Sequence, residues 1–299
     1  MIEISDVLLL IVDARYPPAM LPPSLVKAVS PKPVILVLNK VDLIPPELAV
    51  AWKIYFTQKY SNIHVTYFTS CPAYNLKKAS FEGGGLQFRK LRGRISMARE
   101  GALQIFQTVK SIIGSSLIRT SAMDAWEHRI KNEQEEQEDA AAAAAITDHH
   151  EEGSLTIGMI GHPNVGKSSL INSLMGRRVV SVSKTPGHTK HFQTIFVSPS
   201  IRLCDCPGLV FPSLVPRPFQ VILGSYPIAQ TREPYSVVQL LAERLDLPSM
   251  LKLEQQRSKK WTTYDICEAW AGKLVVQRVI EQRLVCFLDR QTWICNSQK

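Results

Sequence analysis

The chain has 299 residues, 45% of them hydrophobic, and carries a formal net charge of +9 with a pI near 9.3. This length and apolar content allow a large α/β domain with a smaller second one, and they exclude a chain that is disordered throughout. The charge favours polyanionic partners, and the six scattered cysteines, which form no C-x-x-C pair, give no sign of a zinc ribbon and indicate a reduced, intracellular compartment.

The amino-terminal part alternates between apolar runs and helix-forming stretches. Uninterrupted apolar runs are typical of parallel strands covered on both faces, and a proline at the first helical position favours a helix start. The expected strands are residues 7–12, 34–38 and 63–68, and the expected helices are residues 25–29 and 45–60. This alternation predicts a doubly wound α/β sheet. The first run is short and lacks preceding basic residues, so we expect neither a signal peptide nor a membrane association.

The middle of the chain changes in composition twice. Residues 72–95 contain three consecutive glycines and several basic side chains, and we interpret them as a flexible insertion. Residues 97–113 have the periodicity of an amphipathic helix. The acidic and alanine-rich residues 131–153 have no core to bury, which predicts a linker.

Regular structure is expected to resume after this linker. The expected elements are strands over 155–160, 193–197 and 201–204 and helices over 169–175, 236–245 and 264–271. Prolines interrupt the sequence after the last of these strands. We therefore expect one domain over 1–214 and a small, mainly helical domain over 215–299, which is atypical or truncated after residue 272.

A glycine loop follows the strand at 155–160. Residues Gly161–Ser168 match G-x-x-x-x-G-K-[ST], with a strand before and a helix after. In such a loop backbone N–H groups wrap phosphates, Lys167 reaches the β- and γ-phosphates, and Ser168 ligates Mg²⁺. The expected phosphate-binding residues are Asn164, Val165, Gly166, Lys167, Ser168 and Ser169.

Two later loops complete the expected phosphate and metal site. Asp205 ends a strand and can hold the hydration shell of Mg²⁺, while the N–H of Gly208 can meet the γ-phosphate. The polar stretch KTPGHTK lies between the glycine loop and Asp205, and its Thr189 can add a hydroxyl to the metal; a plain turn is the alternative interpretation of this stretch. The expected metal ligands are Ser168, Thr189 and Asp205, and the expected catalytic residues are Lys167, Thr189 and Gly208.

The stretch Asn39-Lys40-Val41-Asp42 follows an apolar strand and predicts base specificity. The Asp42 carboxylate can accept hydrogen bonds from guanine N1–H and its exocyclic amine, whereas adenine would leave the carboxylate unpaired. Guanine is therefore preferred, with Asn39, Lys40 and Asp42 in the site. A surface turn is the alternative interpretation.

Two stretches are candidates for the loop that closes over the base, Thr69-Ser70-Cys71 and Thr120-Ser121-Ala122. The second is closer in its letters to the Ser-Ala pair common in such loops. The first lies at the carboxyl end of a predicted strand, where open α/β sheets bind ligands. We therefore select Ser70.

The motifs NKVD, GHPNVGKS, TPGHTK and DCPGL occur in that order. This order resembles the circularly permuted GTPases, in which the guanine-specifying loops precede the phosphate loop. The resemblance covers roughly residues 4–271, including Asp13-Ala14-Arg15 and the segments GSYPIAQ and DICEAWA, and is strongest to the guanine nucleotide-binding protein-like 1 group. Permutation is tolerable because all the binding loops lie on one edge of the sheet.

The resemblance implies GTP and GDP as ligands, Mg²⁺ as cofactor and a P-loop GTPase sheet in permuted order. It also implies a helical carboxyl-terminal domain associated with RNA or a ribosomal particle, and hence nuclear or nucleolar localisation. Relatives usually carry a basic segment before the first strand, whereas this sequence starts almost on that strand, so the cytoplasm is the alternative.

Leu209 stands where many GTPases carry a glutamine that orients the attacking water. A leucine cannot do this, so we expect slow intrinsic hydrolysis that a partner surface or a monovalent cation accelerates. Asn164 is a candidate K⁺ ligand by resemblance, or it stabilises the loop. The alternatives to a GTP-hydrolysing switch are a GTP/GDP-binding scaffold with negligible turnover and an adenine-specific ATPase in which NKVD is accidental.

Overall fold

The computed structural model describes residues 1–69, 85–114, 120–131, 154–182, 192–209, 215–226, 231, 233, 235–253 and 260–274, with the backbone alone described for 85–95 and 120–121. Contacts divide the chain into two compact units. The first comprises Met1–Val215 and Leu223–Ser225, and the second comprises Pro216–Ile222 and Tyr226–Lys299.

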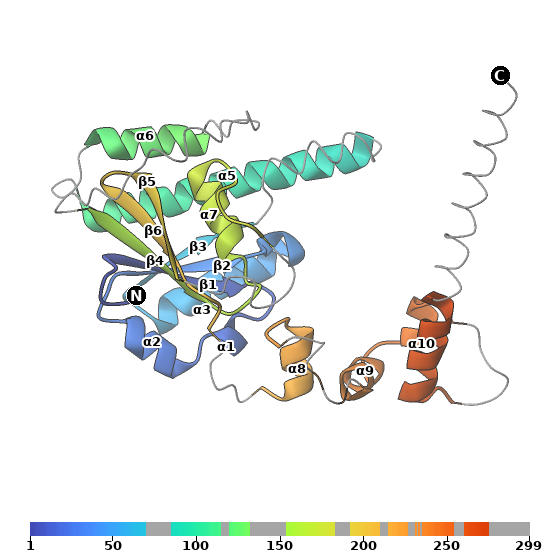
Figure 1. Cartoon of the computed structure of the whole chain (residues 1–299). Coiled ribbons are helices and arrows are strands. Elements are labelled where there is room, and N and C mark those ends of the chain that lie inside the picture. The colour runs from blue at the N-terminus through green and yellow to red at the C-terminus, as the bar shows by residue number, and fades with distance from the viewer. Residues whose placement is uncertain are drawn as a thin grey trace, which may run out of the picture. The chain divides into compact units, whose positions relative to one another are not determined.

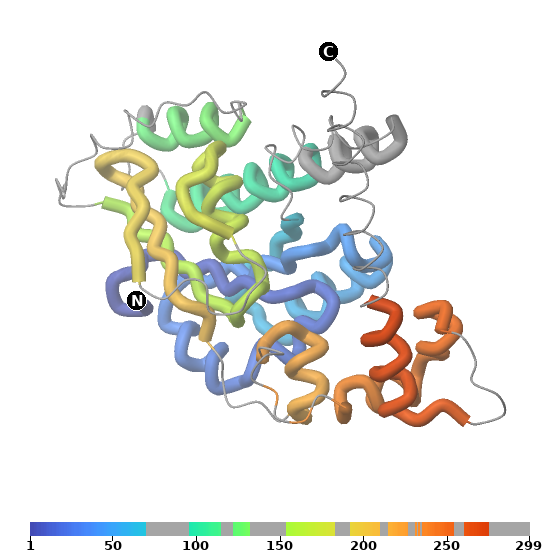
Figure 2. The backbone as a smooth tube through the Cα atoms, turned by 45° about the vertical axis from the view of Figure 1, so that its right-hand side comes forward, coloured from blue at the N-terminus to red at the C-terminus, as the bar shows by residue number. Residues whose placement is uncertain are grey.

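Within the described residues, six strands form one sheet in the order β3-β2-β1-β4-β6-β5 (Figures 1 and 2). The strands are β1 (Val7–Asp13), β2 (Val34–Asn39), β3 (Ile63–Tyr67), β4 (Leu155–Gly161), β5 (Gln193–Ser198) and β6 (Ile201–Asp205). All neighbours are parallel except β5, which runs antiparallel to β6. Every residue of β1, β2 and β4 is buried, and the apolar runs of β1 and β2 predict this for those two strands. The expected doubly wound α/β sheet is confirmed.

Helices cover both faces of this sheet. They are α1 (Pro17–Met20), α2 (Pro23–Val29), α3 (Pro46–Lys59), α5 (Gly85–Ile113), α6 (Thr120–Lys131) and α7 (Lys167–Met175), with a 3-10 turn at Val41–Leu43. Figure 1 shows α5, α6 and α7 above the sheet and α1 and α2 below it. Two-sided cover explains why the central strands carry no polar face.

The flexible insertion predicted over residues 72–95 is wrong for its second half, because α5 begins at Gly85. The lysines and arginines of this second half therefore do not mark a loop. These residues are good helix formers, and their long side chains lose little freedom in a helix. Residues 70–84 lie outside the described part of the chain.

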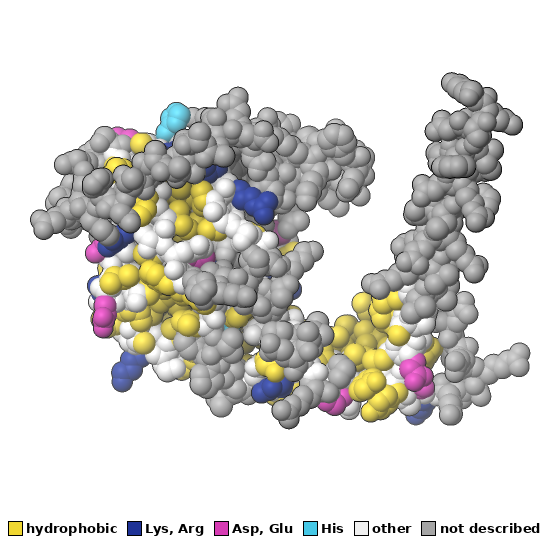
Figure 3. Space-filling view, in the orientation of Figure 1, with side chains coloured by type: hydrophobic (Ala, Val, Ile, Leu, Met, Phe, Trp, Pro, Cys, Tyr) yellow, Lys and Arg dark blue, Asp and Glu magenta, His cyan; other side chains and the backbone are white. Residues whose placement is uncertain are grey.

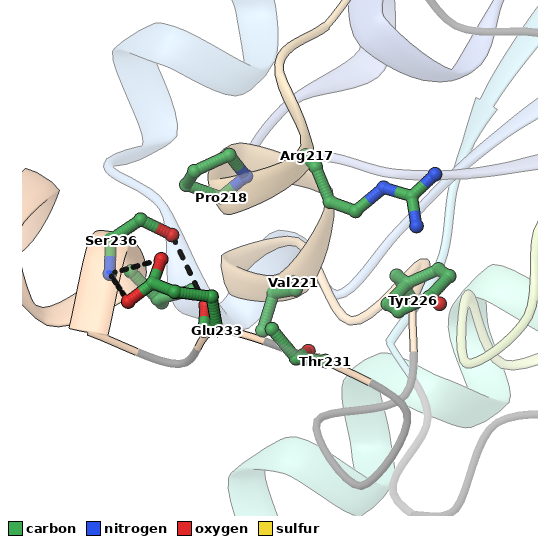
Figure 4. Close-up of a pocket in the computed structure, with 8 residues that line it drawn as sticks. Arg217, Pro218, Val221, Tyr226, Thr231, Glu233 and Ser236 are labelled. Atoms are coloured by element: carbon green, nitrogen blue, oxygen red, sulfur yellow. Dashed lines mark hydrogen bonds between the residues drawn. The ribbon is translucent and has the colours of Figure 1, made fainter.

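The second unit is mainly helical in its described residues, as predicted. It contains α8 (Arg217–Ile222), α9 (Tyr235–Ala242), α10 (Leu247–Met250) and a helix over 263–274. The second unit has a pocket lined by residues that include Arg217, Tyr226 and Glu233 (Figure 4). The Arg217 guanidinium lies 4.7 Å from the centre of the Tyr226 ring. Both Glu233 carboxylate oxygens accept from the Ser236 N–H at 3.1 Å. This last contact satisfies a donor at the start of α9. None of the described helices is both long and apolar enough to span a membrane.

Candidate functional site

The carboxyl ends of four parallel strands meet at one edge of the sheet. In register, Asp13 of β1 pairs with Asn39 of β2, while Ile11 of β1 pairs with Gly161 of β4. Asp205 ends β6, the strand on the other side of β4. Loops from both halves of the chain therefore lie side by side, although they are far apart in sequence (Figure 2). Open α/β sheets bind ligands at this edge.

The glycine loop leads from β4 into α7. Asn164 and Gly166 have φ angles of 58° and 101°, in the left-handed region, which lets the backbone fold back over the helix start. The Lys167 ammonium donates to the carbonyls of Gly161 at 3.1 Å and His162 at 2.8 Å. Burial lowers the pKa of Lys167, while the nearby Cys206 and Asp205 act to raise it. The lysine is held over the loop at the place where a phosphate would bind.

Asp205 and Ser168 form the centre of the predicted metal site. One Asp205 oxygen, Oδ2, accepts from Ser168 Oγ at 3.5 Å and from Gln193 Nε2 at 3.4 Å. The other, Oδ1, is buried and has no hydrogen-bond partner within the described residues. Burial raises the pKa of the Asp205 carboxyl, and the Lys167 charge opposes this shift. An unpaired carboxylate oxygen beside a hydroxyl fits Mg²⁺, which prefers oxygen ligands.

The loop after β6 packs directly on the glycine loop. The Leu209 N–H donates to the Gly161 carbonyl at 3.1 Å, and Cys206 Sγ donates to the Met159 carbonyl at 3.1 Å. A Cβ atom on Gly208 would lie 2.5 Å from the Pro163 nitrogen, so only glycine fits there. The two predicted phosphate loops therefore form one packed surface.

The guanine-type loop is joined to the glycine loop by side chains. Asn39 Nδ2 donates to the Val165 carbonyl at 2.5 Å, across 126 residues of sequence. Lys40, at a left-handed φ of 63°, extends its Nζ to the Asn164 carbonyl at 2.7 Å. Asn39 Oδ1 also accepts from the Lys40 N–H at 2.7 Å, which fixes the turn. These contacts place the expected base-binding and phosphate-binding residues in one site.

Asp42 lies in the turn that follows, with its side chain partly exposed. Its Oδ1 accepts from the Thr69 hydroxyl at 2.5 Å, and Thr69, which lies shortly after the end of β3 at Tyr67, is buried. A carboxylate held in this way has a fixed orientation. Thr69 belongs to the candidate stretch Thr69-Ser70-Cys71 but has no predicted role of its own, while Ser70 lies outside the described residues.

The described structure brings together most of the predicted site residues. They are Asn39, Lys40, Asp42, Asn164, Val165, Gly166, Lys167, Ser168, Ser169, Asp205 and Gly208. Ser70 and Thr189 lie outside the described residues, so the structure does not place their side chains. Thr120–Ala122, the alternative to Ser70, forms the first turn of α6. Asp13, which contacts Lys40 at 2.8 Å, belongs to the same cluster and was given no role from sequence.

Comparisons with known proteins bear on this site. A family profile described as "50S ribosome-binding GTPase" matches residues 156–265. Guanine nucleotide-binding protein-like 1 of Mus musculus is 43% identical over 91% of this chain and 50% of its own length. Large subunit GTPase 1 homolog of Mus musculus is 53% identical over 96 residues, which are 32% of this chain and 15% of that protein. The solved GDP-bound structure of TM YlqF aligns with a TM-score of 0.42 at 16% identity, over 90% of this chain and 87% of that one.

The chain thus spans about half the length of the curated relatives that it matches over most of its own residues. In the sheet, β4, the strand before the glycine loop, lies next to β1, and β1 pairs on its other side with β2, the strand that the guanine-type loop follows. Both β1 and β2 precede β4 in the sequence. Strand order, motif order and sequence similarity together show that the chain belongs to the circularly permuted GTPases.

Proposed function

We propose that this protein binds GTP and GDP with Mg²⁺, hydrolyses GTP slowly and acts as a nucleotide switch in the assembly of a ribosomal or other RNA-containing particle. The observation that carries the proposal is the pair of contacts from Asn39 and Lys40 to the carbonyls of Val165 and Asn164. A single nucleotide can then reach from a base-reading carboxylate to a phosphate-binding lysine.

Each residue has a distinct role in this proposal. Asp42 accepts hydrogen bonds from the guanine N1–H and exocyclic amine, and Ser70 closes over the base. Lys167 and the N–H groups from Asn164 to Ser169 bind the phosphates. Ser168, Asp205 and Thr189 would hold Mg²⁺, which would supply positive charge beside the phosphates and offset the negative charge that develops there. Gly208 offers its N–H to the γ-phosphate.

Slow hydrolysis follows from Leu209. Its backbone N–H is already bonded to the Gly161 carbonyl, and its side chain cannot orient water by hydrogen bonding. Asn164 Nδ2 donates weakly to the Gly224 carbonyl at 3.4 Å, so the side chain has a loop-stabilising contact beside its proposed role as a K⁺ ligand. GTP turnover measured in KCl and in NaCl tests the role of Asn164 as a K⁺ ligand. Equal rates in the two salts would exclude that role.

The switch proposal is supported by how the chain is shared between the units. Leu223–Ser225 belongs to the nucleotide-binding unit, while the residues on both sides belong to the second unit. The second unit also presents hydrophobic side chains on the face seen in Figure 3, and its exposed apolar residues include Leu245, Met250, Tyr264, Trp270 and Leu274. Such a surface is typical of a site for a partner.

The names of the matched proteins support the choice of particle. They refer to ribosome binding and to the large subunit. We propose the nucleus or nucleolus as the location because the family resemblance implies it, with the cytoplasm as the alternative.

A nucleotide-competition titration followed by phosphate-release measurements tests the function. GTP and GDP should displace labelled GDP equally well, whereas ATP should be weaker by about two orders of magnitude or more. ATP competing as well as GTP would overturn guanine specificity. At saturating GTP, release that rises on adding ribosomal particles supports the switch. Negligible phosphate release with and without the particles favours a scaffold that binds GTP or GDP. This is the second candidate function, because Leu209 cannot orient the attacking water.

A further inference from the structure

Asp13 ends β1, the strand between the base-reading and phosphate-binding loops. Its side chain is only 1% exposed, and one of its oxygens, Oδ2, lies 2.8 Å from Lys40 Nζ and 2.8 Å from Arg15 Nη2. The other oxygen accepts from the Arg15 N–H at 3.0 Å and from Arg15 Nε at 2.9 Å. One buried carboxylate therefore serves two cations.

The ion pair with Arg15 already gives both oxygens of the buried Asp13 carboxylate a hydrogen-bond partner. Arg15 is two residues away and binds both Asp13 oxygens through its side chain, which is the strong, geometrically specific form of such pairs. These contacts account for the burial of Asp13 without any help from Lys40. The contact with Lys40 is therefore additional, and it crosses from β1 to the loop after β2.

Lys40 connects Asp13 to the nucleotide site. A lysine ammonium sits on a flexible four-carbon stem, so a single carbonyl such as that of Asn164 defines its position poorly. With Asp13 on one side and the Asn164 carbonyl on the other, Nζ has two fixed acceptors at 2.8 and 2.7 Å. Ordering the side chain before a ligand arrives lowers the entropy cost of binding.

We propose that Asp13 is a positioning residue for guanine nucleotides, which holds Lys40 against the phosphate loop without touching the nucleotide itself. This inference rests on the proposed function, since it concerns the same site. It assigns to the Asp13-Ala14-Arg15 stretch two separable tasks: Arg15 keeps the carboxylate buried and oriented, and the carboxylate sets the geometry of Lys40.

The test is a double-mutant cycle on GDP and GTP affinity with Asp13→Asn and Lys40→Ala. Asp13→Asn keeps the shape and removes the charge, and we expect both affinities to fall by about tenfold, the usual size of a lost charge-assisted contact. In Lys40→Ala both affinities should fall by at least as much. The double variant should bind GDP and GTP no more weakly than Lys40→Ala alone. Thermal unfolding of each nucleotide-free variant is measured alongside.

Asp6→Asn is the matched control, because Asp6 precedes the amino end of the same strand, where its Oδ2 accepts from the Thr156 N–H at 2.7 Å. It should leave nucleotide affinity within about twofold of the parent. A merely structural role for Asp13 would instead give additive losses in the cycle that follow the loss of thermal stability, and this result would overturn the inference, as would unchanged affinity in Asp13→Asn. A parent chain that binds no guanine nucleotide would overturn the proposed function itself.

Discussion

At the scale of single residues, the carbonyl groups of the glycine loop are engaged by the protein. The acceptors are the carbonyls of Gly161, His162, Asn164 and Val165, and the donors are Lys167, Leu209, Lys40 and Asn39. A carbonyl oxygen repels a phosphate, whereas an N–H attracts it. Turning these carbonyls toward side chains therefore suits a loop that binds an anion.

His162 gives this loop a measurable pH dependence. The side chain is 4% exposed, and burial together with the Lys167 charge lowers its pKa to about 4 from 6.5. The unfolded chain takes up the proton near its ordinary pKa, so the folded state loses stability as the pH falls from about 6.5 toward about 4. Between pH 7 and pH 5 we expect His162 to contribute a loss of about 2 kcal/mol in the free energy of unfolding.

Urea unfolding of the parent chain and of His162→Gln at both pH values checks this. Glutamine keeps a polar group of similar size and does not titrate in this range, so the variant should show a loss smaller by that amount. An identical pH dependence in the two proteins would show that His162 does not titrate in this way.

At the scale of elements, α6 supports the helix that starts at the glycine loop. Trp126 of α6 is 1% exposed, donates its Nε1–H to the Leu174 carbonyl of α7 at 2.8 Å and meets Phe106 edge to face at 5.0 Å. At the end of α7, Gly176 has a φ of 65°, and a Cβ there would lie 2.6 Å from the Arg129 carbonyl. The last helix before the predicted linker thus fixes the carboxyl end of α7.

Trp126→Phe should destabilise the fold while leaving guanine nucleotide affinity nearly unchanged. The substitution removes a buried donor and leaves the Leu174 carbonyl unpaired, which costs about 1–3 kcal/mol beyond the loss of ring volume. Trp52→Phe on α3 is the matched control, because Trp52 Nε1 has no hydrogen-bond partner within the described residues. Denaturant unfolding of both variants compares the two; equal losses would contradict the role of the hydrogen bond.

The sequence predicts elements well where one physical signal dominates. Continuous apolar runs correctly predict β1 and β2, since only doubly covered strands tolerate them. The antiparallel direction of β5 was not predicted, because pairing direction depends on where the connection crosses the sheet. The short helices α1 and α8 were missed for a related reason: so few residues carry too little periodicity.

The candidate site shows the same division. Motif spacing predicts which residues gather at one edge of the sheet, because the loops after neighbouring parallel strands lie side by side there. Residues that only support these groups have no motif. Asp13 contacts Lys40 in the turn after β2, and Thr69, which follows β3, donates to Asp42; no motif gives either residue its role.

At the scale of the whole molecule, the two halves of the chain are held together by the sheet as well as by the covalent connection between them. β1 pairs with β4 in parallel from Val7↔Ile157 to Ile11↔Gly161, and the contacts of Asn39 and Lys40 cross the same boundary. Chain order is therefore less important to the site than strand position.

A protease site inserted within residues 132–153 tests this arrangement. After cleavage, the two fragments should run as one species in size-exclusion chromatography and bind GDP within a few-fold of the uncleaved protein, because the buried sheet contacts remain. The uncleaved insertion variant is the control for the insertion itself. Separation of the fragments under native conditions would contradict the expected cohesion.

The central claim is that Asp42 and Lys167 bind opposite ends of one nucleotide, and the most direct measurement is the affinity for xanthosine diphosphate in Asp42→Asn with and without Lys167→Ala. An asparagine amide offers a donor where xanthine has an acceptor, so Asp42→Asn should lose GDP affinity and gain affinity for xanthosine diphosphate. Adding Lys167→Ala should then weaken xanthosine diphosphate binding by at least about tenfold. Retained GDP affinity in Asp42→Asn, or xanthosine diphosphate binding that is indifferent to Lys167, would contradict the shared site.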